Sequence, residues 1–133
     1  LAPLCRPVGL KNQSIDIIKS FSSEAVLGPV STDTHKGTVA HMKADLAPNS
    51  HDPTPVKMAW LIFPQYLAES LTQLTSVTRG EALMRAATQS FNYSTLGRRG
   101  FDALADAIGS AKCFDFQYSN LDEALKTFDK LAA

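Results

Sequence analysis

The chain has 133 residues, of which 44% are hydrophobic and 20% charged, the proportions of an ordinary soluble globular protein. Thirteen basic residues balance thirteen acidic ones without forming a basic block, which argues against a nucleic-acid partner. No apolar run approaches the ~20 residues of a membrane helix, so we expect no membrane partner. Two cysteines expected to be free thiols and no visible signal peptide favour a cytoplasmic location.

The first third of the chain alternates between extended and helical patterns. The run 6–10 is extended, and isoleucines at helical spacing predict a helix over 12–21 with Asn12 at its cap. The run 24–31 is an extended segment that is broken by a Gly-Pro turn. Alternating side chains over 37–44 predict a strand.

The middle of the chain contains the most apolar segment. Three prolines and several turn-forming residues predict a loop over 45–55. The apolar run 56–66 predicts a strand at the centre of its sheet, and 71–78 is a second extended run. A helix is expected over 78–91, with a capping box that begins at Thr78.

The last third predicts a helix, a strand and a helix. The helices cover 96–111 and 120–132, and the strand 113–119 alternates aromatic with polar residues. Asn120 is in the capping position of the last helix. Four residues form the expected apolar stripe of that helix: Leu121, Leu125, Phe128 and Leu131.

Strands interleaved with helices predict an α/β fold, a mixed sheet with packed helices. No linker divides the sequence, so we expect residues 1–133 to form one domain or one fragment of a domain. Cys5 and Cys113 are too few for a disulfide scaffold, and two free thiols are expected. The first residue is Leu1 rather than Met, which favours a piece or a processed product of a longer protein.

The polar stretch "STDTHKGTVAHM", residues 31–42, contains residue types that bind phosphate. A Walker A loop reads G-x-x-x-x-G-K-[ST] and precedes a helix. Here Lys36 comes before Gly37 and Thr38, and a strand pattern follows, so the stretch is not a P-loop. Two interpretations stay open, which are a phosphate-binding surface and a polar turn that leads into a strand.

The same stretch contains candidate metal ligands. His35 and His41 lie near Asp33, and His51 precedes Asp52 in the predicted loop. A zinc site needs three or four ligands with a fixed second shell, and only the first two histidines are well placed. We therefore expect no metal site, and because no G-x-S-x-G motif occurs, we assign no catalytic residue.

Lys11 and Asn12 follow a predicted strand and precede a helix. Open α/β sheets place ligands at such strand ends, which makes both residues candidates for ligand binding. The alternative is structural, with Lys11 a solvated lysine and Asn12 a helix cap.

Five segments of the chain, taken in order, resemble the C-terminal part of the bacterial HPr kinase-related proteins, which are relatives of HPr serine kinase. The segments are "CRPVGLKNQSIDIIKSF", "GPVSTDTHKGTVAHM", "WLIFPQY", "AATQSFNYSTLGRRGF" and "CFDFQYSNLDEALKTFD". The pieces "RPVGLKNQSID" and "DTHKGTVAH" are the most specific to the family. The resemblance covers nearly the whole chain.

The resemblance implies an ATP-dependent serine protein kinase whose fold shares a P-loop core with HPr kinase and phosphoenolpyruvate carboxykinase. In such a protein the Walker A loop, the Mg²⁺-binding acidic residues and the catalytic base lie upstream of the segment "RPVGLKN". This chain lacks them, so ATP and Mg²⁺ are expected as cofactors of the full-length parent, and the chain by itself is not expected to be catalytic.

Six residues inside the family-like motifs are candidates for binding phosphate or substrate: Lys11, Asn12, Lys36, Gly37, Thr38 and His41. Ammonium groups and backbone N–H groups would supply positive potential there. The expected partners are a protein substrate and a second copy of the chain, joined through an exposed sheet edge or apolar face.

Two alternatives from other functional classes remain. The chain could be a non-catalytic α/β protein-binding module derived from the kinase fold. It could also be a binder of small anions that uses Lys36 and the turn over 31–38.

Overall fold

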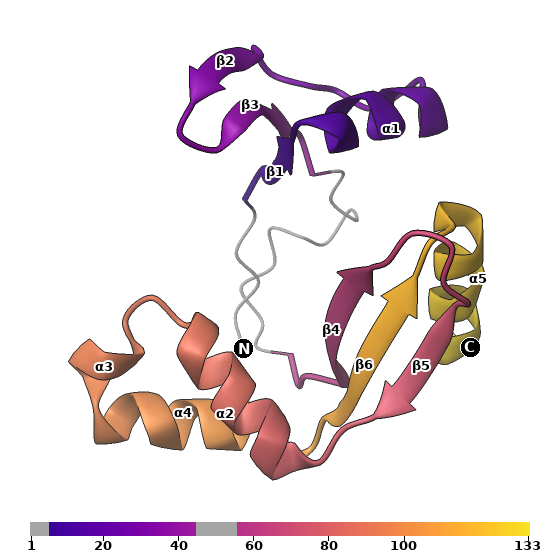
Figure 1. Cartoon of the computed structure of the whole chain (residues 1–133). Helices are drawn as coiled ribbons and strands as arrows, with labels where there is room; N and C mark the ends of the chain where they lie inside the picture. Colours follow the sequence, from indigo (N-terminus) through magenta and orange to yellow (C-terminus); the bar gives the residue numbers. More distant parts are fainter. Residues whose placement is uncertain (1–5, 45–55) are drawn as a thin grey trace. The chain divides into compact units, whose positions relative to one another are not determined.

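A computed structural model describes residues 6–44 and 56–133, which form two compact units (Figure 1). The first unit runs from Ala2 to Val56 and the second from Lys57 to Ala133. The expected α/β class is confirmed, but the described residues form two small sheets where we expected one mixed sheet. The predicted loop over 45–55 and the pairing state of Cys5 lie outside the described residues.

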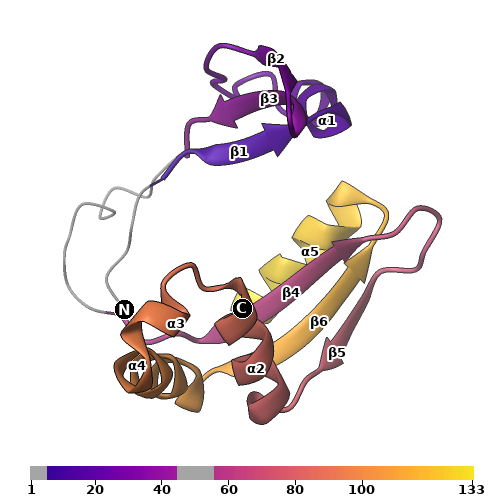
Figure 2. The ribbon, with the colours of Figure 1, turned by 60° about the vertical axis from the view of Figure 1, so that its left-hand side comes forward.

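The described residues of the N-terminal unit, 6–44 and Val56, include a three-stranded antiparallel sheet and one helix (Figure 2). Its elements are β1 (Val8–Lys11), α1 (Gln13–Phe21), β2 (Ser31–Thr34) and β3 (Gly37–Met42). The strand order is β1-β3-β2, so β3 pairs with both neighbours. The helix predicted over 12–21 is confirmed as α1, and the strand predicted over 37–44 is confirmed as β3.

The core of the N-terminal unit lies between α1 and one face of the sheet. Leu10 and Ala40 are opposite each other on β1 and β3, and both are buried with Ile15 of α1. Because side chains alternate along a strand, Lys11 and His41 point to the other face of the sheet. The helix thus covers one face through its apolar side and leaves the polar face without a helix from this unit.

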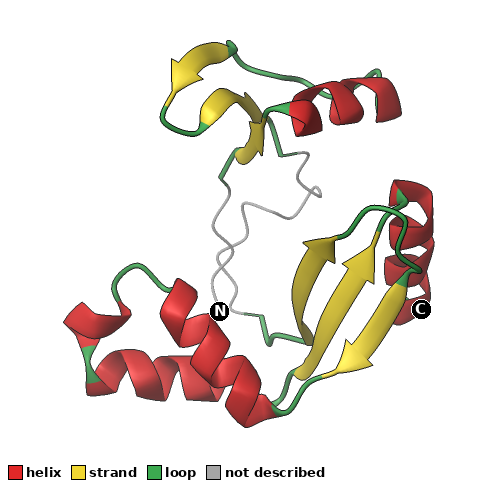
Figure 3. Ribbon diagram, in the orientation of Figure 1, coloured by secondary structure: helices red, strands yellow, loops and turns green. Residues whose placement is uncertain are grey.

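The C-terminal unit combines a mixed sheet with four helices among its described residues (Figure 3). In chain order the elements are β4 (Trp60–Tyr66), β5 (Gln73–Ser76), α2 (Arg79–Gln89), α3 (Tyr93–Leu96), α4 (Arg98–Gly109), β6 (Lys112–Tyr118) and α5 (Leu121–Ala132). The strand order is β4-β6-β5, in which β4 runs parallel and β5 antiparallel to β6. The helix expected over 96–111 begins at Arg98, because Gly97 separates it from the short α3.

The prediction that the apolar strand lies at the centre of its sheet is wrong, because the last strand, β6, lies between β4 and β5. The Ala59 carbonyl accepts from Lys112 N–H, and Leu67 N–H donates to the Tyr118 carbonyl. Odd-numbered residues of β4 therefore direct their backbone groups toward β6, and even-numbered residues direct theirs toward the open edge. Pro64 is an even-numbered residue, so its backbone faces the open edge of the sheet. Because proline has no N–H, this is the position where it interrupts no hydrogen bond between strands.

Helices cover both faces of this sheet (Figure 2). On one face Phe116 is 1% exposed and packs against Phe128 of α5, with 4.8 Å between ring centroids. On the other face Cys113 is a buried free thiol packed with Ala82 of α2 and Ile108 of α4. Side chains are therefore buried on both faces of this three-stranded sheet.

The N-terminal caps predicted for the helices over 78–91 and 120–132 are present in α2 and α5. The Thr78 hydroxyl accepts from Glu81 N–H at 3.3 Å, and Asn120 Oδ1 accepts from Glu123 N–H at 3.2 Å. The predicted stripe of α5 is wrong at Leu125, which is 45% exposed. Ala124 is buried in its place, since the small side chain lets the helix approach β6 closely. Neither described range contains a helix that is long and apolar enough to span a membrane.

We predict that Phe116→Ala lowers the free energy of unfolding of the C-terminal unit by about 3–5 kcal/mol, because it leaves a cavity between β6 and α5. The matched control is Phe91→Ala, which removes the same atoms from a side chain that is fully exposed. Urea unfolding followed by the fluorescence of Trp60, the single tryptophan, measures both variants. Equal midpoints for the two variants would contradict the assigned core.

Candidate functional site

The structure brings the two most specific sequence motifs into register on neighbouring strands. β1 and β3 pair antiparallel, with Lys11 opposite Val39 and Gly9 opposite His41. The ladder continues past the end of β1, where Asn12 N–H donates to the Thr38 carbonyl at 2.8 Å. The β1–α1 junction and the β2–β3 turn therefore lie side by side.

Asn12 joins the two segments with its side chain. Its Oδ1 accepts from Thr38 N–H at 3.0 Å, so the prediction that this side chain caps α1 is wrong. The first turn is instead held by Ser14, whose hydroxyl donates to the Lys11 carbonyl at 2.7 Å and accepts from Lys11 N–H at 2.8 Å. The Asn12 carboxamide is thus used for tertiary structure rather than for the helix.

The backbone of Asn12 adopts a conformation that normally requires glycine. Its φ is 48° and its ψ is −126°, close to the 51° and −127° of Gly97. A side chain in this region costs about 1–3 kcal/mol unless its surroundings hold it there. The two hydrogen bonds to Thr38 provide that restraint.

Gly37 makes the close approach possible. Its φ is +81°, and a Cβ built at this position would collide with the Asn12 carboxamide. Glycine is the residue that both adopts this φ and leaves space for the neighbouring side chain. Gly37 therefore meets a packing requirement in addition to its place at the turn.

The turn between β2 and β3 satisfies its own backbone groups. The Thr34 hydroxyl donates to the Gly37 carbonyl at 2.6 Å and accepts from Lys36 N–H at 3.1 Å. The Thr38 N–H is occupied by Asn12, as described above. We expected backbone N–H groups here to attract an anion, but those of Lys36 and Thr38 already have acceptors. These two N–H groups are therefore not free for an anion, whereas the exposed side chain of Lys36 is.

Of the six residues chosen from the sequence, the structure joins Lys11, Asn12, Gly37 and Thr38 through the ladder and the hydrogen bonds at its end. Lys36 is exposed in the adjacent turn, and His41 is exposed two residues beyond Val39 on the face shared with Lys11. Within 6–44 and 56–133, neither lysine ammonium forms an ion pair with a carboxylate. The same ranges contain no cluster of three or more His, Cys, Asp or Glu suited to a metal ion.

A second candidate site, missed by the sequence analysis, lies in the C-terminal unit. A cleft of about 740 Å³ opens between α2 and the sheet, and its floor is the face that carries Cys113, Asp115 and Gln117. Arg85 of α2 lies above this floor.

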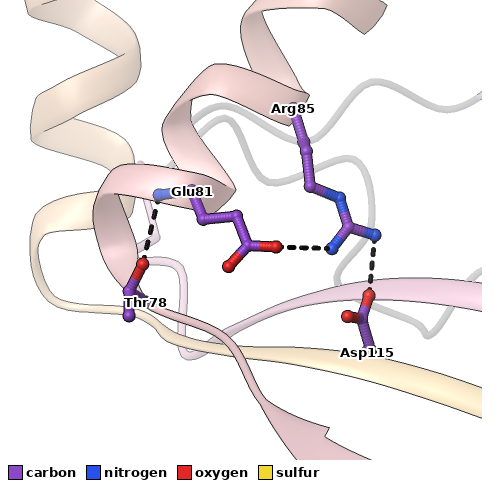
Figure 4. Close-up of polar contacts among 4 residues, drawn as sticks. All are labelled: Thr78, Glu81, Arg85 and Asp115. Carbon is purple, nitrogen blue, oxygen red and sulfur yellow. Dashed lines mark hydrogen bonds and ion pairs between the residues drawn. The ribbon is translucent and has the colours of Figure 1, made fainter.

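Arg85 is fixed by three neighbours. Its guanidinium is 2.6 Å from the Asp115 carboxylate and 3.7 Å from that of Glu81 (Figure 4). The same guanidinium stacks on the Phe63 ring, 3.9 Å from the ring centroid. The hydrogen bond to Asp115 raises the pKa of Arg85 above its already high ordinary value. The arginine therefore stays charged, and nearby carboxylates balance its charge.

The sequence contained one signal for this second site. In the alternating strand 113–119, Asp115 shares a face with the buried Cys113, and a partly buried carboxylate on that face favours a polar or charged partner. Arg85 becomes this partner because α2 docks on the sheet. The hydrophobic periodicity of the sequence does not determine where a helix docks.

Comparisons of the chain with family models, with curated proteins and with solved structures find no match. The chemistry of the two sites therefore has to be argued from their own residues.

We predict that Gly37→Ala lowers the stability of the N-terminal unit by about 2 kcal/mol or more, since it combines a strained φ with a collision against Asn12. Gly9→Ala in the same unit is the control, because a Cβ there meets no atom within 4 Å. Hydrogen exchange of the β3 amides measures the effect. Equal protection in both variants would rule out the packing role of Gly37.

Proposed function

We propose that the chain is the C-terminal portion of an ATP-dependent HPr kinase-related serine protein kinase. The supporting observation is the Asn12 junction, which aligns the two family-like motifs across β1 and β3 through hydrogen bonds to Thr38. A strained polar residue that persists at such a junction is typical of a functional surface. ATP and Mg²⁺ are the cofactors of the longer parent in this proposal, and its target is a serine of a protein substrate.

Lys11 and Lys36 are the residues that would act on a phosphate group. Both are exposed and without a carboxylate partner in the described ranges, so their positive charge is available to a ligand. Because the Lys36 and Thr38 N–H groups are occupied, the ammonium groups carry the interaction. They supplement the P-loop lysine and Mg²⁺ of the parent, which neutralise the transferred phosphoryl group.

The edge of β4 also supports a larger parent. Trp60 and Ile62 direct their backbone groups away from β6, and Trp60 is 37% exposed. Parallel strands normally lie inside sheets that are covered on both sides. A further strand alongside β4, as the P-loop core of a kinase would supply, can pair with this edge as far as Pro64.

We predict that Lys36→Ala and Lys11→Ala each weaken binding of Mg-ATP to the natural-length protein by about tenfold to a hundredfold, the range for a lost charge-assisted hydrogen bond. Lys43→Ala is the control, because Lys43 is also exposed but lies beyond the end of β3. Isothermal titration calorimetry with Mg-ATP and an assay of phosphoryl transfer to protein test both variants.

Unchanged affinity in both lysine variants would remove Lys11 and Lys36 from the site. Absence of Mg-ATP binding by the natural-length protein would refute the kinase proposal and favour the non-catalytic binding module.

A further inference from the structure

Three glutamines form a row across the sheet of the C-terminal unit. Gln117 on β6 is opposite Gln65 on β4 and Gln73 on β5, and all three line the cleft described above. Residues directly opposite one another on paired strands point to the same face. Neighbouring strands are ~4.8 Å apart, so the three carboxamides extend over about 10 Å.

These carboxamides are accessible to a ligand, because Gln65 and Gln73 are exposed and Gln117 is partly buried. Within the described residues none of the three side chains makes a hydrogen bond, and the same holds for Gln89, which lines the cleft from α2. Each carboxamide offers two N–H donors and one carbonyl acceptor. The row therefore presents alternating donors and acceptors to a ligand.

The row lies where α/β sheets commonly place ligands. Gln65 and Gln117 are near the carboxyl ends of the parallel strands β4 and β6, the preferred location of binding sites in such sheets. The helix α2 packs on the preceding part of the same face, over Leu61 and Cys113 (Figures 1 and 2). The helix therefore forms a wall of the cleft and leaves the glutamine row open.

The chemistry of the cleft excludes several ligand classes. The charge of Arg85 is balanced by Asp115, so an anion would have to displace a contact of 2.6 Å. A nucleobase commonly stacks on an aromatic ring, and the Phe63 ring in this cleft is already covered by the same guanidinium at 3.9 Å. An extended peptide pairs with a sheet edge, whereas this cleft lies on a sheet face.

We propose that the cleft binds a small neutral polyhydroxylated ligand of the carbohydrate class. Each sugar hydroxyl both donates and accepts a hydrogen bond, which matches carboxamides that do the same. The volume of about 740 Å³ lies in the range of small-molecule sites. This proposal does not depend on the kinase proposal, because the two sites lie in different units.

The test uses the full chain and three probes: glucose, N-acetylglucosamine and maltose. NMR titration is expected to shift the side-chain NH₂ signals of Gln65, Gln73 and Gln117 with at least one probe. Gln117→Ala is expected to weaken that binding about three- to tenfold, because it removes the central hydrogen-bonding group. Gln13→Ala is the matched control, since Gln13 is an exposed glutamine of the other unit.

Absence of any shift at saturating probe, or equal affinity in Gln117→Ala and Gln13→Ala, would overturn the proposal. Shifts of the glutamine signals by inorganic phosphate or adenosine but not by a sugar would also overturn it. If Gln117→Ala lowers the unfolding midpoint, Gln73→Ala on the edge strand β5 replaces it, with the same expected loss.

Discussion

The N-terminal unit depends on the contact between the Asn12 carboxamide and Thr38 N–H. This contact holds Asn12 in a backbone conformation that suits glycine, and Gly37 provides the space that the carboxamide occupies. A junction of this kind fixes the relative position of the β1–α1 connection and the β2–β3 turn. The backbone positions of Lys11 and Lys36 are therefore fixed next to each other, and their exposed side chains extend from these positions into solvent.

In the C-terminal unit the corresponding constraint is the insertion of β6 between β4 and β5. β6 presents Phe116 to α5 on one face and Cys113 to α2 and α4 on the other. Farther along the same strand, Gln117 carries the middle of the glutamine row. One strand thus organises both the core and the floor of the cleft, and a change in its register would alter both.

The two candidate sites differ in the chemistry that they offer. The N-terminal site presents lysine ammonium groups that have no carboxylate partner among the described residues, which fits the phosphate chemistry of the proposed kinase. The cleft presents an arginine that is neutralised by Asp115 and carboxamides that are accessible, which fits a neutral polar ligand. The motif resemblance led to the first site, whereas only the arrangement of β4, β5, β6 and α2 exposed the second.

The sequence by itself determined most elements, because helical and strand periodicity and capping residues such as Thr78 and Asn120 are local properties. It also identified Lys11, Asn12, Gly37 and Thr38, which the structure joins. Tertiary structure decided what local pattern does not encode: the edge position of β4, the exposure of Leu125 and the contact of Arg85 with Asp115. The physical reason is that strand order and helix docking depend on contacts between residues far apart in the chain, and the division into two sheets has the same origin.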